Sequence, residues 1–253
     1  MYCSALLIMS SARAQNCTHI FINSWDIWEN VIKFISAAEQ LLLAASCWTM
    51  NNIVCSFLGH RLLSTLHPFI EDPSGFLSVL WAAKAVISGS FVVDFIFGTC
   101  ETEWHAADLD ICVSHQDFAI LLDGLFEIGF LVDGTTACPV LYCGNEIESI
   151  VHVSDDSCQL NIIVSRRSSC ITPLFQNHSS LLMNYVTANS FFSGYPRLSS
   201  RSLGFVNPLL DHRKLFSPEM MLSLEKYRMQ GFTIRAASSF GLLIEAGKWC
   251  FKR

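Results

Sequence analysis

The chain has 253 residues, of which 51% are hydrophobic and 15% are charged, and its formal net charge at pH 7 is −6. So apolar a chain is not intrinsically disordered, and its length suffices for one large core or for a medium domain with a small one attached. The acidic balance argues against a broad, nonspecific surface for nucleic acid.

Neither a membrane span nor a disulfide framework is expected. The most apolar stretch, residues 35–59, is interrupted by polar residues, and no run reaches the roughly 18–20 apolar residues that a spanning helix needs. The eleven cysteines are scattered without a C-x-x-C pair, which is typical of reduced, buried thiols and offers no zinc spacing. We expect a soluble protein of the cytoplasm or nucleus with no membrane partner.

Helical patterns dominate the first part of the chain. Apolar residues recur at helical spacing from residue 25 to residue 35, after Asn23 or Ser24 as N-cap, and a second helical segment follows at 39–58. The prolines at 68 and 73 predict a loop, because proline disfavours helix in the residue before it. We therefore expect a helical N-terminal region, 1–72, and a second domain, 73–253.

Helices and strands are mixed in the second domain. The sequence predicts helices at 76–83, 91–97 and 118–130, strands at 85–87, 109–113, 130–132, 140–143, 148–153 and 159–164, and further helices at 179–187 and 218–229. Residues 155–157 are typical of a hairpin turn. The expected fold class is α/β (α+β), with a small mixed sheet flanked by helices and a mainly helical C-terminal tail.

The segment from Ser88 to Asp110 carries the chemistry. Ser88-Gly89-Ser90 joins a strand to a helix, so backbone N–H groups and a hydroxyl meet at a helix N-terminus, which suits a phosphate. Gly89 has no Cβ and lets the backbone approach closely. Asp108 and Asp110 are two residues apart on a strand, so both project from one face and can share divalent cations.

This order of parts, Ile-Ser-Gly-Ser, a helix and Asp-Leu-Asp-Ile over residues 86–113, resembles the nucleotidyltransferase superfamily, which includes DNA polymerase β and the poly(A) polymerases. The resemblance implies that Asp108 and Asp110 are catalytic and hold Mg²⁺, and that Ser88, Gly89 and Ser90 bind the phosphates of a nucleoside triphosphate. It implies transfer of a nucleotidyl group from that triphosphate to an acceptor hydroxyl.

The same family usually carries a third carboxylate on a neighbouring strand. Here that strand is 158–164, whose centre offers Asn161 or Gln159, and neither side chain brings a negative charge. We place Asn161 third in the metal site, with Glu146 or Glu148 as alternative carboxylates from the preceding strand. Without the third charge, a pseudoenzyme that binds but does not transfer stays open.

Glu101, Glu103 and His105 precede the aspartates and could line a metal site, but a solvated loop explains them better. The pair Arg166-Arg167 could hold a triphosphate after the last strand, or could simply lie on the surface. His152 and His178 are most simply explained as satisfied or exposed histidines. The chain also resembles fungal proteins that combine this core with a His-Ser-Ser-x-x-Met-Asn segment and a Tyr-Pro pair. Those segments lie here at residues 178–184 and 195–196.

The N-terminal helices suggest a second function. Residues 23–36 and 41–48 resemble a degenerate F-box, a helical module that docks on the linker subunit of cullin-type ubiquitin ligases, although the leucine-proline pair that opens the motif is absent. The resemblance implies a non-catalytic adaptor with a protein partner. The alternative is a helical hairpin packed on the second domain. A docking module leaves an apolar patch exposed on these helices, whereas a core hairpin buries it.

Overall fold

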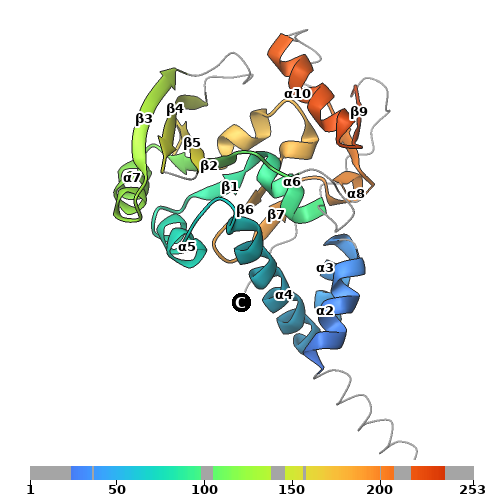
Figure 1. The fold of residues 1–253 in the computed structure, drawn as a ribbon. Coiled ribbons are helices and arrows are strands. Elements are labelled where there is room, and N and C mark those ends of the chain that lie inside the picture. Colours follow the sequence, from blue (N-terminus) through green and yellow to red (C-terminus); the bar gives the residue numbers. More distant parts are fainter. Residues whose placement is uncertain are drawn as a thin grey trace, which may run out of the picture. The chain divides into compact units, whose positions relative to one another are not determined.

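The computed structural model describes residues 24–35, 37–97, 105–137, 146–155, 158–199, 201–207 and 218–236 (Figure 1). The chain divides into two compact units, 1–61 and 62–253, so the division falls within α4 (Trp48–Leu66), before the expected boundary at residue 72. The predicted strand at 140–143 lies outside the described residues, as do Asn23, Glu101 and Glu103. Within the described residues, no helix is both long and apolar enough to cross a membrane.

The first unit consists of helices. α2 (Trp25–Phe34), α3 (Ala37–Ser46) and the first part of α4 (Trp48–Leu66) follow one another with short breaks. Gln40 is buried, and its Nε2 donates to the carbonyl oxygens of Ile32 (3.1 Å) and Ile35 (3.2 Å). The carbonyl of Ile32 also accepts from the N–H of Ile35 (3.4 Å), so the amide of Gln40 adds a second donor at the end of α2, where carbonyl groups lose their regular helical partners. The single helix predicted at 39–58 is therefore two helices, and the second continues to Leu66.

Seven described strands of the second unit form one sheet in the order β3-β4-β5-β2-β1-β6-β7. They are β1 (Val86–Ser88), β2 (Leu109–Ser114), β3 (Leu131–Ala137), β4 (Ile147–Ser154), β5 (Gln159–Ser165), β6 (Asn184–Val186) and β7 (Phe191–Ser193). β2 and β5 are parallel, and the other neighbours are antiparallel. A separate small sheet pairs β8 (Leu203–Phe205) with β9 (Thr233–Arg235) in parallel. This architecture confirms the predicted α/β class.

Helices flank the main sheet, as expected. They are α5 (Pro73–Ala82), α6 (Gly89–Phe97), α7 (Phe118–Glu127), α8 (Pro196–Ser199) and α10 (Pro218–Met229), with short 3-10 helices η1 (Thr172–Gln176) and η2 (Ser180–Leu182). Asp72 caps α5, because its Oδ1 accepts from the backbone N–H groups of Ser74 (3.1 Å) and Gly75 (3.0 Å). The predicted helices at 76–83, 91–97, 118–130 and 218–229 are thus confirmed, with small differences at their ends.

The helix predicted over 179–187 is wrong, because η2 and β6 occupy this segment. Ser179 Oγ accepts from the N–H of Leu181 (3.2 Å), and Asn184 Nδ2 donates to the carbonyl of Leu181 (2.6 Å). Such short polar side chains offer the backbone partners that compete with a helix. β6 then pairs with β1, Val186 opposite Ile87. The tail keeps its helical elements but also extends the main sheet by two strands.

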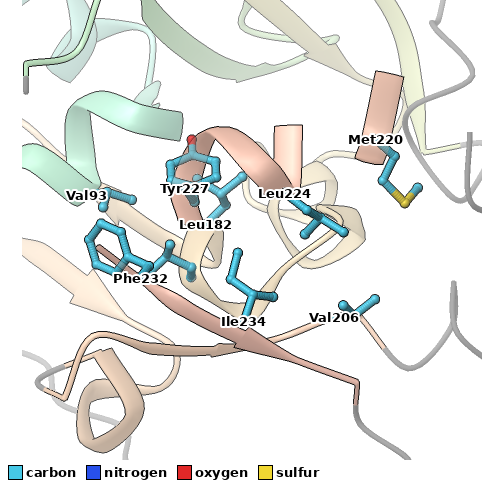
Figure 2. Packing of buried hydrophobic residues seen from close by; sticks show 9 residues of the cluster. Val93, Leu182, Val206, Met220, Leu224, Tyr227, Phe232 and Ile234 are labelled. Carbon is cyan, nitrogen blue, oxygen red and sulfur yellow. The ribbon is translucent and has the colours of Figure 1, made fainter. Parts of the chain in front are cut away.

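An apolar cluster fixes α10 against the rest of the second unit. Its members are Val93, Leu181, Leu182, Val206, Met220, Leu224, Tyr227, Phe232 and Ile234. Figure 2 shows the ring of Tyr227 packed among these side chains, with its hydroxyl oxygen at the edge of the group. Because the cluster joins α6, η2, α10 and β9, burial of its apolar surface holds the C-terminal helix beside the turn that starts α6.

Candidate functional site

The turn between β1 and α6 folds onto the first residues of β2. Gly89 has a φ of +73°, in the left-handed region that favours glycine. A Cβ atom at this position would overlap the carboxylate of Asp110. The antiparallel register places Ser88 directly opposite Asp110. The close backbone approach predicted for Gly89 is therefore an approach to the second aspartate.

The two predicted aspartates lie together at the start of β2. Ser90 Oγ donates to Asp108 Oδ1 at 2.9 Å, and Leu109 and Ile111, which alternate with the aspartates, are fully buried. Burial, and then the charge of Asp108, raise the pKa of Asp110 to about 6. A carboxyl group whose ionisation is disfavoured by burial and by a neighbouring carboxylate gains from a bound cation.

Asn161 occupies the position that the sequence assigned to it, but in a particular orientation. β5 runs parallel to β2 with Asn161 beside Asp110. Asn161 Nδ2 donates to Asp110 Oδ1 (3.0 Å), so the amide nitrogen faces the carboxylate. The amide oxygen lies 3.0 Å from His152 Nδ1, and His152 Nε2 lies 3.1 Å from Thr136 Oγ1.

The alternative carboxylates, Glu146 and Glu148, do not reach the site. Glu146 accepts two hydrogen bonds from Arg167, of 2.6 and 3.0 Å, and Glu148 Oε2 lies 2.7 Å from His115 Nδ1. The β4–β5 register places Ile147 opposite Ser165, four residues along the strand from Asn161, or roughly 13 Å away. Arg167 is held at the same far end, so the proposed role of Arg166 and Arg167 in holding a triphosphate is not supported by their place in the sheet.

A cavity of about 240 Å³ opens over the carboxylates. Its walls include all five residues expected from the β1–β2 segment: Ser88, Gly89, Ser90, Asp108 and Asp110. Ser88 Oγ lies 3.4 Å from Cys112 Sγ, and Ser90 Oγ is bonded to Asp108, so both hydroxyls have a protein partner. The structure thus brings the predicted residues to one place, although Asn161 does not line this cavity.

α10 supplies three cavity residues that the sequence did not indicate, Ser223, Lys226 and Tyr227. The Tyr227 side chain is buried, and burial followed by the charges of Asp110 and Asp108 raises the pKa of its phenol, which keeps it protonated. Lys226 is exposed, with Nζ 5.9 Å from the Tyr227 ring centroid. Its charge acts to lower the pKa of Asp110. A cation and a phenol from the tail therefore face the carboxylate pair.

His178 lines the cavity as a buried, uncharged imidazole. Burial lowers the pKa of His178 to about 4. Its Nε2 is buried and has no hydrogen-bond partner among the described residues, and its ring lies 6.3 Å from that of Tyr227. The sequence interpretation of His178 as a satisfied or exposed side chain is wrong for this nitrogen. His105, by contrast, is exposed and pairs with Asp94 at 3.5 Å.

The segment 178–184 has a structural explanation. Ser180 Oγ accepts from the N–H of Phe205 (2.9 Å), and the carbonyl of His178 accepts from the N–H of Asn207 (2.9 Å). Together with the bonds of Ser179 and Asn184 to Leu181, these contacts set the turn of η2 and join it to β8. The motif positions the wall of the cavity that carries His178.

The residues present fit a divalent cation only in a limited way. Among the described residues, no group of three or more His, Cys, Asp or Glu side chains could hold a metal ion. Mg²⁺ is commonly held by one or two carboxylates together with substrate phosphates, and Asp108 and Asp110 meet that lower requirement.

No family model matches this chain, and no curated protein matches it.

Proposed function

We propose that this cavity binds a Mg²⁺-bound nucleoside triphosphate and serves the transfer of its nucleotidyl group to an acceptor hydroxyl. The observation that carries the proposal is the Gly89 turn, which folds onto Asp110 while Ser90 bonds Asp108. A helix N-terminus suited to phosphate and a carboxylate pair suited to a cation therefore share one cavity.

Asp108 and Asp110 would hold the ion, and the raised pKa of Asp110 supports this role because a cation stabilises the ionised pair. When bound, the ion neutralises phosphate charge. The start of α6 would orient the phosphates through its backbone N–H groups. Lys226 also lines the cavity and supplies a positive charge, whose flexible ammonium group can contact a phosphate oxygen.

The cavity volume indicates which part of the ligand is enclosed. About 240 Å³ lies below the roughly 300–1,000 Å³ of pockets that bury a whole drug-sized ligand. The cavity would therefore enclose the ion and the phosphates, with the rest of the nucleotide toward its mouth. His178 and Tyr227 would then limit access of water to the phosphates.

Thermal melting with Mn²⁺ and each nucleoside triphosphate tests the proposal. A ligand at about 100 times its Kd stabilises the fold by about 2.7 kcal/mol, so a matching triphosphate raises the melting temperature. The Asp108→Asn/Asp110→Asn variant should lose this shift. An Asp123→Asn/Asp133→Asn variant, which removes two exposed charges, should keep it. An equal shift in the Asp108/Asp110 variant would overturn the proposal.

A second candidate function rests on the surface of α2. Ile27, Val31 and Phe34 lie at helical spacing and are 42%, 38% and 88% exposed, while Trp28 and Ile32 on the other face are buried. An exposed apolar stripe on one helix face is typical of a docking surface. It supports a non-catalytic, F-box-like adaptor that binds the linker subunit of a cullin-type ubiquitin ligase.

Direct binding to the purified linker subunit tests this second candidate. The wild-type chain should bind, and Val31→Glu/Phe34→Glu should not, because charges on the stripe prevent its burial. Phe126→Glu is the matched control, since Phe126 is an equally apolar, 67% exposed side chain in the second unit. No binding by the wild-type chain, or equal binding by all three proteins, would reject the adaptor function.

A further inference from the structure

A chain of side-chain hydrogen bonds crosses four neighbouring strands and ends at the carboxylate pair. Thr136 on β3, His152 on β4, Asn161 on β5 and Asp110 on β2 are linked by contacts of 3.1, 3.0 and 3.0 Å. Asn161 stands directly opposite His152 in one register and beside Asp110 in the other. Thr136 is exposed, so the chain runs from the protein surface to the site.

The hydrogen bonds of this series have one consistent order of donors and acceptors. An ionised Asp110 only accepts, so Asn161 turns its NH₂ group toward Asp110 and its oxygen toward His152. That oxygen needs a donor, so the hydrogen of His152 lies on Nδ1, and Nε2 accepts from the Thr136 hydroxyl. Each partner thus holds the next in a single orientation. Thr136 and His152 therefore determine that the nitrogen, and not the oxygen, of the Asn161 amide faces Asp110.

This orientation limits the oxygens that a cation can use. Asn161 donates to Oδ1 of Asp110, and Ser90 donates to Oδ1 of Asp108, so each carboxylate has one oxygen occupied by a donor. Among the described residues, the other oxygen of each aspartate accepts no hydrogen bond and is open to a ligand. On the β5 side, a cation would meet the N–H hydrogens of Asn161, which repel it, instead of an oxygen.

We propose that the Thr136–His152–Asn161 chain is a positioning device that limits the carboxylate pair to a single divalent cation. The inference rests on the proposed cation site of Asp108 and Asp110 and adds the number of cations that this site can bind. Asn161 acts through Asp110, and His152 and Thr136 act through Asn161. The limit of one cation follows because Asn161 presents N–H donors, and not an oxygen, on the β5 side of the site.

Counting Mn²⁺ ions bound to the nucleotide-free protein tests the capacity, because a triphosphate would bring its own ion. Electron paramagnetic resonance of free Mn²⁺ during a titration gives the number bound, after subtraction of binding to Asp108→Asn/Asp110→Asn. The wild-type chain should bind one Mn²⁺. Asn161→Asp should bind two, because a third carboxylate then faces Asp110. Thr135→Asp adds a carboxylate at an exposed β3 position and should still bind one.

The outcomes separate this inference from the proposed function. Two ions bound to the wild-type chain would overturn the single-cation limit and leave the cation site standing. One ion in both the wild-type chain and Asn161→Asp would overturn the role of Asn161. No ion in either protein would overturn the inference but not the proposed triphosphate site, which the melting experiment tests with phosphates present as further ligands.

His152→Phe tests the positioning step separately. Phenylalanine fills the ring's space without a donor, so the Asn161 oxygen loses its partner and can turn toward the cation. The Kd for Mn²⁺ should fall relative to the wild-type chain, while the melting temperature without metal reports any structural effect. His115→Phe removes an exposed imidazole near the other end of β4 and should leave the Kd unchanged. An unchanged Kd in His152→Phe would overturn the role of His152.

Discussion

The backbone of Gly89 lies against the carboxylate of Asp110, so closely that position 89 has no space for a Cβ atom. The contact joins the end of β1 to the start of β2 through the Ser88–Asp110 pair of the antiparallel register. It means that the turn and the acidic pair are built together. A change on one side of the contact must displace the other.

Gly89→Ala should destabilise the fold and remove triphosphate binding. Alanine in the left-handed region costs roughly 1–2 kcal/mol, and overlap with Asp110 adds to that cost. Gly129→Ala is the matched control, because Gly129 also has a positive φ but a Cβ there meets no atom within 4 Å. Urea unfolding measures both variants, and an equal loss of stability in the two would show that the overlap is relieved without cost.

Asp110→Asn should stabilise the ligand-free protein at pH 7. The folded pKa of Asp110 is raised from 3.8 to about 6, so its stabilising contribution is present at low pH and is lost as pH rises through 6. Near neutral pH, removing this charge should therefore raise the free energy of unfolding by roughly 1–3 kcal/mol. The gain accompanies the loss of cation binding.

Asp117→Asn provides a control of opposite sign for the same measurement. The Ser114 hydroxyl, 2.7 Å from Asp117 Oδ2, and the nearby Lys84 lower the pKa of Asp117. Its contribution is present above the ordinary carboxyl pKa and is lost on acidification, so Asp117→Asn should destabilise the protein at pH 7. If both variants are destabilised, ionisation of Asp110 does not cost the folded protein free energy, and the prediction for Asp110→Asn is wrong.

His178→Gln should flatten the dependence of stability on pH between 4 and 6.5. Burial lowers the folded pKa of His178 from 6.5 to about 4, so only the unfolded chain takes up this proton in that interval. Acidification from 6.5 to 4 should then cost the wild-type chain roughly 2–3 kcal/mol through His178. The contribution of Asp110 to stability changes in the opposite direction between pH 4 and 6. The free energy of unfolding is therefore measured against pH for the wild type, His178→Gln and Asp110→Asn, and the three slopes are compared. An unchanged slope in His178→Gln would contradict the prediction.

Native alkylation should separate the described cysteines by burial. Burial raises the pKa of the Cys112 thiol to about 12 and that of Cys158 to about 11, and the thiolate is the reactive form. The exposed Cys47 and Cys55 should react with iodoacetamide at pH 8 well before these two. Peptide mass mapping measures the order, with urea-unfolded protein as the control. Early labelling of Cys112 would exclude the tight packing of β2 against Ser88.

The sequence predicted the β1–Gly89–α6–β2 segment because its signals are local. An apolar run, a glycine and two aspartates on alternate positions require no knowledge of distant residues. The pairing of His152 with Asn161 did not follow from the same local signals. Counting outward from the predicted turn at 155–157 pairs Ser154 with Cys158 and His152 with Leu160, which is one residue away from the register in the structure, where His152 lies opposite Asn161.

Other parts of the site depend on contacts between distant segments. β6 joins β1 across about a hundred residues, and nothing within Asn184–Val186 indicates a partner. Lys226 and Tyr227 reach the cavity only because α10 packs on the cluster of α6, η2 and β9. The helix was predicted from its own residues, but the element that it faces was not. Local pattern identifies an element, and tertiary packing decides which side chains it brings to the site.

β1 consists of three residues and is bonded on both sides, by β2 and by β6. A recombinant fragment cut after β5 would expose one edge of this strand and invite pairing with other chains. It would also lose Lys226 and Tyr227 from the cavity. The smallest autonomous piece that retains the site must therefore extend through α10 and β9, which makes the tail part of the domain that any truncation series has to preserve.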